Sequence, residues 1–116
     1  MASDLDAVEA RLWAALDRYR PELVDGTIYG MPSLLLPGAT GHDYFAAVRR
    51  GQKKIGLSLI IADRWPEDVE RASVELRRCR TGKATWSFTE LDEAVADELE
   101  ALLDRLMVRY RIERSA

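Results

Sequence analysis

The sequence contains a single cysteine, Cys79, and a single histidine, His42. One cysteine allows no internal disulfide and no CxxC pair for zinc or thiol redox chemistry. The histidine lies in a turn beside Asp43, and no GxSxG motif accompanies it. We therefore predict a protein that is not an enzyme, with no catalytic residues, no bound metal and no cofactor.

Long hydrophobic runs are also lacking. The longest apolar stretches, at 34–36 and 57–62, are much shorter than the roughly 20 residues that cross a bilayer. The first residues, MASDLDAVEA, are acidic where an export signal would be positively charged. The net charge of −3 provides no general attraction to nucleic acid or anionic membranes. We expect a soluble cytoplasmic protein without nucleic-acid or membrane partners.

Proline and glycine are few, with 4 and 7 residues among 116. Apolar residues make up 47% of the chain and charged residues 32%, which is an ordinary globular composition. The length suits one hydrophobic core and is short for two. Residues 1–116 are therefore predicted to form a single domain.

Helical periodicity marks three segments. Apolar residues recur every three or four positions over 4–19, and again from an N-cap at Asp92 to about residue 112. A further helix is expected to begin near Pro66 and to end before Gly82, because proline suits a first helical turn and glycine a helix end. Each of these helices would carry one buried apolar stripe.

Strand patterns lie between the helices. The segment SLLL at 33–36 follows a short loop at 22–26, and DYFAAVRR and KIGLSLII flank the turn RGQK, which is typical of a hairpin. KATWSF at 83–88 alternates apolar and polar residues. The predicted order is α-β-β-β-α-β-α: an α+β fold with an antiparallel sheet of about four strands and helices packed on one face.

Small residues in two predicted neighbouring strands suggest a ligand site. Ala46, Ala47, Gly56 and Ser58 either leave a cavity or let a helix approach closely. In the first case, Gly30 and Pro32 bend an edge strand so that Tyr29 and Met31 face the cavity. The predicted ligand-binding residues are Tyr29, Met31, Pro32, Gly56, Ser58, Lys83 and Trp86.

Charged clusters allow further readings. RRGQKK at 49–54 and RRCR with Lys83 could bind an anion if the fold joins them, although such clusters are more often solvated. TGKAT at 81–85 does not fit a phosphate-binding loop, because it leads from a helix into a strand. Four carboxylates on one face of the last helix could hold a hard cation or ferrous iron, or simply favour solubility: Glu93, Asp97, Glu100 and Asp104.

Three segments resemble the YdhG-like family of bacterial domains of unknown function: YGMP at 29–32, KKIGLSL at 53–59, and TGKATWSF at 81–88 before a long helix. The resemblance spans about residues 20–110 and implies a small cytoplasmic α+β domain without an established reaction. One family member is described as a frataxin-like iron chaperone, which implies carboxylate iron ligands. The chain departs from the family pattern at Lys54, where histidine is frequent, and at Ser58, where an aromatic residue is common.

Three functional hypotheses follow. The leading one is a non-catalytic binding domain that holds a small ligand or a protein partner near the YGMP segment. The second is an intracellular iron chaperone that uses acidic helix faces, through Glu93, Asp97 and Glu100. The third is a homodimeric structural or regulatory module that pairs through an exposed strand edge, because an open sheet has two edges.

Overall fold

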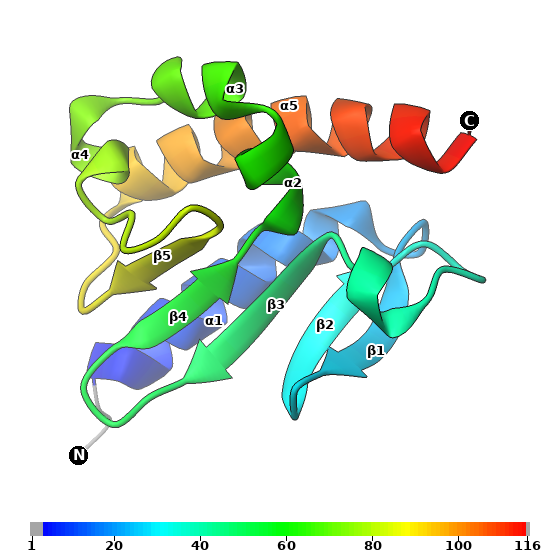
Figure 1. The fold of residues 1–116 in the computed structure, drawn as a ribbon. Helices are drawn as coiled ribbons and strands as arrows, with labels where there is room; N and C mark the ends of the chain where they lie inside the picture. The colour runs from blue at the N-terminus through cyan, green and yellow to red at the C-terminus, as the bar shows by residue number, and fades with distance from the viewer. Residues whose placement is uncertain (1–3, 116) are drawn as a thin grey trace.

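The computed structural model describes residues 4–115 and shows one α+β unit (Figure 1). A 3₁₀ turn follows the first helix at Asp17–Tyr19, and another precedes the third strand at Gly41–Asp43. The helices and strands, in chain order, are α1 (Asp4–Leu16), β1 (Val24–Ile28), β2 (Met31–Leu35), β3 (Ala46–Arg50), β4 (Ile55–Ser58), α2 (Ile60–Arg64), α3 (Pro66–Glu70), α4 (Val74–Arg77), β5 (Thr85–Phe88) and α5 (Glu93–Ser115).

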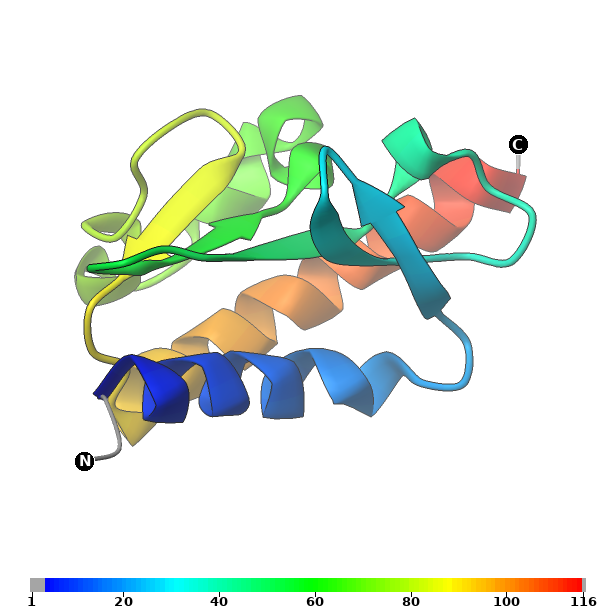
Figure 2. The same ribbon diagram turned by 90° about the horizontal axis from the view of Figure 1, so that it is seen from below.

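The five strands form one antiparallel sheet in which each strand pairs with the next along the chain. Helices α1 and α5 lie along one face of this sheet (Figure 2). The predicted α+β class and antiparallel sheet are confirmed, whereas the predicted number of strands is one too low. None of the helices in residues 4–115 contains a stretch long and apolar enough to cross a membrane.

The strand missing from the prediction is β1, in the segment expected to be a loop. Its sequence VDGTI has little apolar character, and only Ile28 is buried. The strand forms because β2 supplies backbone hydrogen bonds along the whole segment, from Val24 opposite Leu35 to Ile28 opposite Met31. An edge strand of this kind needs few buried side chains, so its periodicity is weak.

Tyr29 and Gly30 form the two-residue turn of the β1–β2 hairpin. Their φ angles are 53° and 77°, the left-handed values that such a turn requires at both positions. The expectation that Tyr29 and Met31 share a face of one extended strand is therefore wrong: Tyr29 is in the turn, and Met31 begins β2.

The single helix expected between Pro66 and Gly82 is divided. The predicted strand KIGLSLII ends at Ser58, and the short helix α2 follows it. Pro66 stops α2 and starts α3, as expected for a residue that lacks a backbone donor. Ser73 then caps α4 by accepting a hydrogen bond from the Leu76 amide at 3.2 Å. The last helix was placed correctly, because the Asp92 carboxylate caps α5 through the Val95 amide at 2.8 Å.

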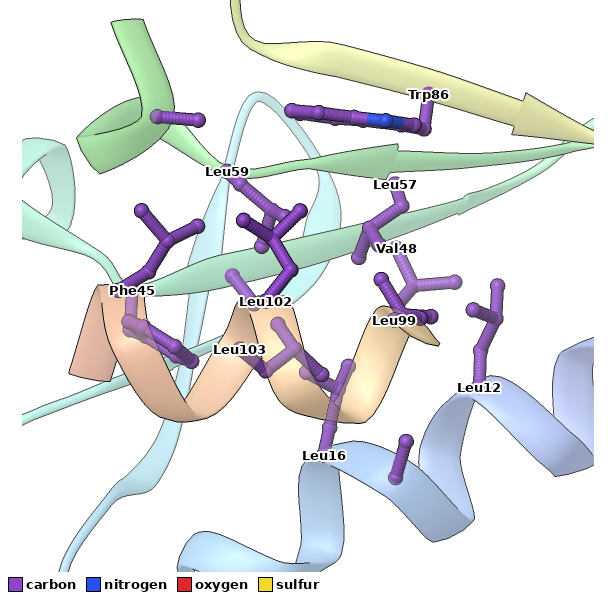
Figure 3. Packing of buried hydrophobic residues seen from close by; sticks show 14 of the residues in the cluster. Leu12, Leu16, Phe45, Val48, Leu57, Leu59, Trp86, Leu99, Leu102 and Leu103 are labelled. Carbon is purple, nitrogen blue, oxygen red and sulfur yellow. The ribbon is translucent and has the colours of Figure 1, made fainter. Parts of the chain in front are cut away.

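The main core lies between the sheet and the two long helices. Leucines of α1 and α5 face Val48 and Leu57 of the sheet (Figure 3). Burying these apolar side chains is the dominant stabilising contribution to the fold. A smaller cluster of Ile28, Leu35, Tyr44 and Ala47 packs on the opposite side of β2 and β3, since its members alternate with core residues along the strands.

The two edges of the sheet differ. The outer side of β5 is covered by the preceding segment, because the Ser87 amide donates to the Cys79 carbonyl at 2.8 Å and the Thr81 amide donates to the Thr85 carbonyl at 2.9 Å. β1 is the other edge and pairs only with β2 among the described strands. Any strand pairing between two copies would therefore use β1.

Stability is expected to fall above about pH 10. The Tyr19 hydroxyl donates to Asp104 at 2.6 Å, and burial followed by this hydrogen bond raises the pKa of Tyr19 well above its usual range. The unfolded chain loses this proton near pH 10 while the folded chain keeps it, so the free energy of unfolding decreases with pH by up to about 1.4 kcal/mol per unit. Below about pH 10 the contribution is fully present.

Urea unfolding at several values from about pH 8 to 11 measures this slope. The control is Tyr19→Phe, which keeps the ring and removes the titrating proton. The variant should lose stability less steeply with pH, whatever its stability at neutral pH. Equal slopes in the two proteins would contradict the assignment to Tyr19.

Candidate ligand-binding site

The sheet face opposite α1 and α5 is built from small and hydroxyl-bearing residues over β3, β4 and β5. Strand alternation directs Val48, Leu57 and Trp86 into the core, so their neighbours lie on the other face. Strand pairing arranges those neighbours in two adjacent rows, Ala47–Ser58–Thr85 and Arg49–Gly56–Ser87. Because most of these side chains are short, they leave open space above this part of the sheet.

A hollow of about 440 Å³ lies over this face, and we call it the first hollow. Its size is within the range of roughly 300–1,000 Å³ that is typical of small-molecule sites. Leu57 and Trp86 are among its lining residues, although both are at most 1% exposed and their side chains belong to the core. The other lining residues are Met31, Arg49, Gly51, Gln52, Lys53, Lys54, Gly56, Ser58, Thr85 and Ser87.

Gly56 leaves space in the first hollow although the fold does not require a glycine there. A Cβ atom added at Gly56 would meet the Arg49 Cβ at 3.6 Å, which is an ordinary contact. A strand glycine with no steric need for its missing side chain is typical of a place where another group approaches the backbone. The space above Gly56 is therefore open to another molecule and is not needed for packing of the sheet.

The charge of the first hollow is positive. Arg49, Lys53 and Lys54 line it, and no aspartate or glutamate does. None of the three forms an ion pair with a carboxylate of the described residues. By contrast, the adjacent Arg50 contacts Asp6 at 2.7 Å and Glu9 at 3.4 Å.

Hydroxyl groups complete the polar lining. The Ser87 Oγ is 3.2 Å from the Thr81 Oγ1, and either can donate. The Ser58 hydroxyl lies beside the Tyr44 phenol, whose pKa is raised by burial and is lowered in part by the hydrogen bond with Ser58. At neutral pH these groups are uncharged and can both donate and accept hydrogen bonds.

A second hollow, of about 630 Å³, lies beside the first between the ends of β2 and β3. Tyr29 is 82% exposed at its border, and its ring is 5.9 Å from the ring of His42 in an edge-to-face arrangement. Met31 and Arg49 line both hollows. The remaining lining residues of the second hollow are Gly30, Pro32, Val48 and Arg50.

The predicted site residues are distributed between these surfaces. Met31, Gly56, Ser58 and Trp86 line the first hollow, whereas Tyr29 and Pro32 line only the second. Lys83 is exposed and lines neither hollow. Trp86 also lines the first hollow, but the residue is completely buried and its side chain belongs to the core.

The ligand-binding residues predicted from the sequence leave out Arg49, Thr85 and Ser87, although Arg49 belongs to the RRGQKK cluster considered for anion binding. A signal was present, because Arg49 is two residues from Ala47 in one strand, while Thr85 and Ser87 alternate with the apolar Trp86. From the segment KATWSF, the predicted ligand-binding set included Trp86 and not Thr85 or Ser87. The hydroxyl face of the same strand is the one that borders the first hollow.

The carboxylates of α5 considered as iron ligands lie mostly against α1. Arg11 contacts Glu93 at 3.1 Å and Glu100 at 2.9 Å, and Arg18 contacts Asp104 at 3.1 Å. Across the described part of the chain, no group of three or more histidine, cysteine, aspartate or glutamate side chains is gathered closely enough to hold a metal ion. Ion pairs with arginines of α1 and of the turn that follows it account for Glu93, Glu100 and Asp104, whereas Asp97 is exposed to solvent.

Fold and site together define a small α+β domain with an open, positively charged and hydroxyl-lined hollow on its exposed sheet face. In comparisons with known proteins, no family model, no curated protein and no solved structure matches the chain. The resemblance to the YdhG-like family therefore stays a prediction.

Proposed function

We propose that this protein is a non-catalytic binding domain that holds a small molecule in the first hollow. The observation that carries the proposal is the hollow of about 440 Å³ over strands β3 to β5, on the face that α1 and α5 leave uncovered. Antiparallel sheets commonly leave one polar face to solvent, and on this face glycine, serine and threonine beside Met31 leave room for a small molecule.

The segments that carry the family resemblance support the same location. YGMP contributes Met31, KKIGLSL contributes both lysines with Gly56 and Ser58, and TGKATWSF contributes Thr85 and Ser87. These segments are distant in sequence and meet around the first hollow. We extend the proposal to membership of the YdhG-like family, with the hollow as the site that its motifs build.

Binding without chemistry suits the lining better than catalysis. A hydroxyl nucleophile needs a general base within hydrogen-bond reach, and no histidine, aspartate or glutamate lines the first hollow. His42 contacts Tyr29 beside the second hollow instead. The iron-chaperone alternative has less support, because Glu93 and Glu100 are already paired with Arg11.

Gly56→Val is expected to abolish ligand binding without destabilising the fold. The added side chain fills the floor of the first hollow, and its Cβ makes only an ordinary contact with Arg49. Because a β-branched residue suits a strand better than glycine, the free energy of unfolding should stay the same or rise by about 0.5–1 kcal/mol. Two-dimensional amide NMR with a fragment library measures binding, and urea unfolding measures stability.

The matched control is Thr27→Val. Thr27 is an exposed strand residue of β1 that lines neither hollow, so this variant should bind the same fragments as the native protein. Fragments that still perturb Ser58, Thr85 and Ser87 in the Gly56→Val protein would contradict the proposed site. A native protein whose amides respond to none of the fragments would contradict the proposed function itself.

A further inference from the structure

No ion pair within the described residues neutralises the three cations that line the first hollow. Arginines on the helix side of the molecule contact carboxylates at ion-pair distance, as Arg11, Arg18 and Arg111 do. Arg49, Lys53 and Lys54 have no such contact among residues 4–115. An unpaired cluster of three cations beside a hollow raises the local concentration of anions.

Strand alternation separates Arg49 from its neighbour Arg50. Arg50 turns to the helix side, where Asp6 and Glu9 of α1 neutralise it. Arg49 is exposed on the other face, opposite Gly56 in the strand pairing. Arg49 lines the hollow beside the missing side chain of Gly56, where a ligand can reach both the cation and the strand backbone.

The groups around that space match the needs of an oxyanion. Guanidinium donors form paired hydrogen bonds to a phosphate or a carboxylate, and lysines add charge without fixed geometry. The hydroxyls of Ser58, Thr85 and Ser87 can donate to the remaining oxygens. No carboxylate lines the hollow to repel the ligand.

We propose that the ligand of the first hollow is a small organic oxyanion, whose phosphate or carboxylate group binds to Arg49, Lys53 and Lys54. This inference rests on the proposed function and names the chemical class of the ligand. Met31 supplies an apolar contact at the border that the first hollow shares with the second, so the anionic group is joined to a small apolar body. The volume suits a small molecule rather than a polymer.

The test compares three probes with one aromatic ring and different charges: phenyl phosphate, benzoate and neutral benzyl alcohol. Each is titrated into the protein at constant ionic strength and followed by two-dimensional amide NMR. We expect saturable shifts at Gly56, Ser58, Thr85 and Ser87, with at least one of the anions binding about tenfold or more tightly than benzyl alcohol. The tighter anion identifies phosphate or carboxylate as the preferred group.

Variants assign the effect to the cluster. Arg49→Gln should weaken anion binding about tenfold and leave the affinity for benzyl alcohol unchanged. Arg50→Gln removes the same charge from the next residue and should leave anion affinity near the native value. Raising sodium chloride from about 50 to about 500 mM should weaken only the anions.

Distinct results overturn the inference and the proposed function. If benzyl alcohol binds the first hollow as tightly as both anions, the ligand class is wrong and the binding function stands. If Arg50→Gln weakens the anions as much as Arg49→Gln, the assigned place is wrong. If the native protein responds to no probe and to no member of the fragment library, both proposals fail.

Discussion

Replacing Trp86 with alanine is expected to lower the free energy of unfolding by about 3–5 kcal/mol. Trp86 is completely buried, and deletion of its ring would leave a large cavity among the core side chains of β5 and the neighbouring helices. Its indole nitrogen has no hydrogen-bond partner in the described residues, so no lost hydrogen bond contributes to this value. Urea unfolding followed by far-ultraviolet circular dichroism gives the measurement.

Two controls separate packing from ligand contact. Trp86→Phe keeps an aromatic ring and should cost about 2 kcal/mol or less, since it also removes an unpaired buried donor. Ser87→Ala changes the adjacent residue on the hollow side and should cost about 1 kcal/mol or less. A Trp86→Ala protein with native stability and lost ligand binding would show that Trp86 contacts the ligand and is not needed for the core.

Asp68→Ala is expected to destabilise the protein by about 2 kcal/mol or more. The Asp68 side chain is only 3% exposed and accepts from the Arg109 Nε at 3.0 Å, while the Arg105 guanidinium donates to its backbone carbonyl at 3.0 Å. These contacts attach α3 to the middle of α5. The value is at the low end for a buried ion pair because Arg109 is 34% exposed and can regain water.

The adjacent Glu67 provides the matched control. It carries the same charge and approaches Arg109 at 3.9 Å, but its side chain is 54% exposed. Glu67→Ala should therefore change the free energy of unfolding by less than about 0.5 kcal/mol. Thermal and urea unfolding of both variants measure the difference, and equal losses would contradict the importance of burial at Asp68.

The parts of the fold that follow from local pattern could be predicted from the sequence. The first and last helices have a regular apolar stripe, and β4 alternates buried and half-buried residues, so their periodicity alone indicates their structure. β1 escaped prediction because pairing with β2, rather than burial, holds an edge strand in place. The division into α3 and α4 escaped because Ala72 and Leu76 continue a helical spacing across the break at Ser73. Helix α2 escaped because its first residues, Ile60 and Ile61, continue the apolar run of the predicted strand.

The candidate site was only partly predictable for a related reason. Small residues in a strand, such as Gly56 and Ser58, indicate open space beside the sheet. Both residues line the first hollow. The helices cover one face of the sheet, and the residues on the other face are the ones that can contact a ligand. Strand alternation shows that Trp86 and its neighbours lie on different faces, but it does not show which face the helices cover. The sequence does not distinguish Arg49 from Arg50. The structure does, because of these two arginines only Arg50 pairs with carboxylates of α1.

The turn at Tyr29 has an energetic meaning of its own. A tyrosine at φ 53° is held in a conformation that asparagine or glycine adopts more readily, at a cost on the order of 1 kcal/mol. Because its ring is 82% exposed, burial offsets little of that cost. This position is locally frustrated, with sequence preference and native backbone in conflict. Such conflicts are expected where selection acts on recognition rather than on folding, and this one lies at the border of the second hollow, one residue from Gly30 and two from Met31.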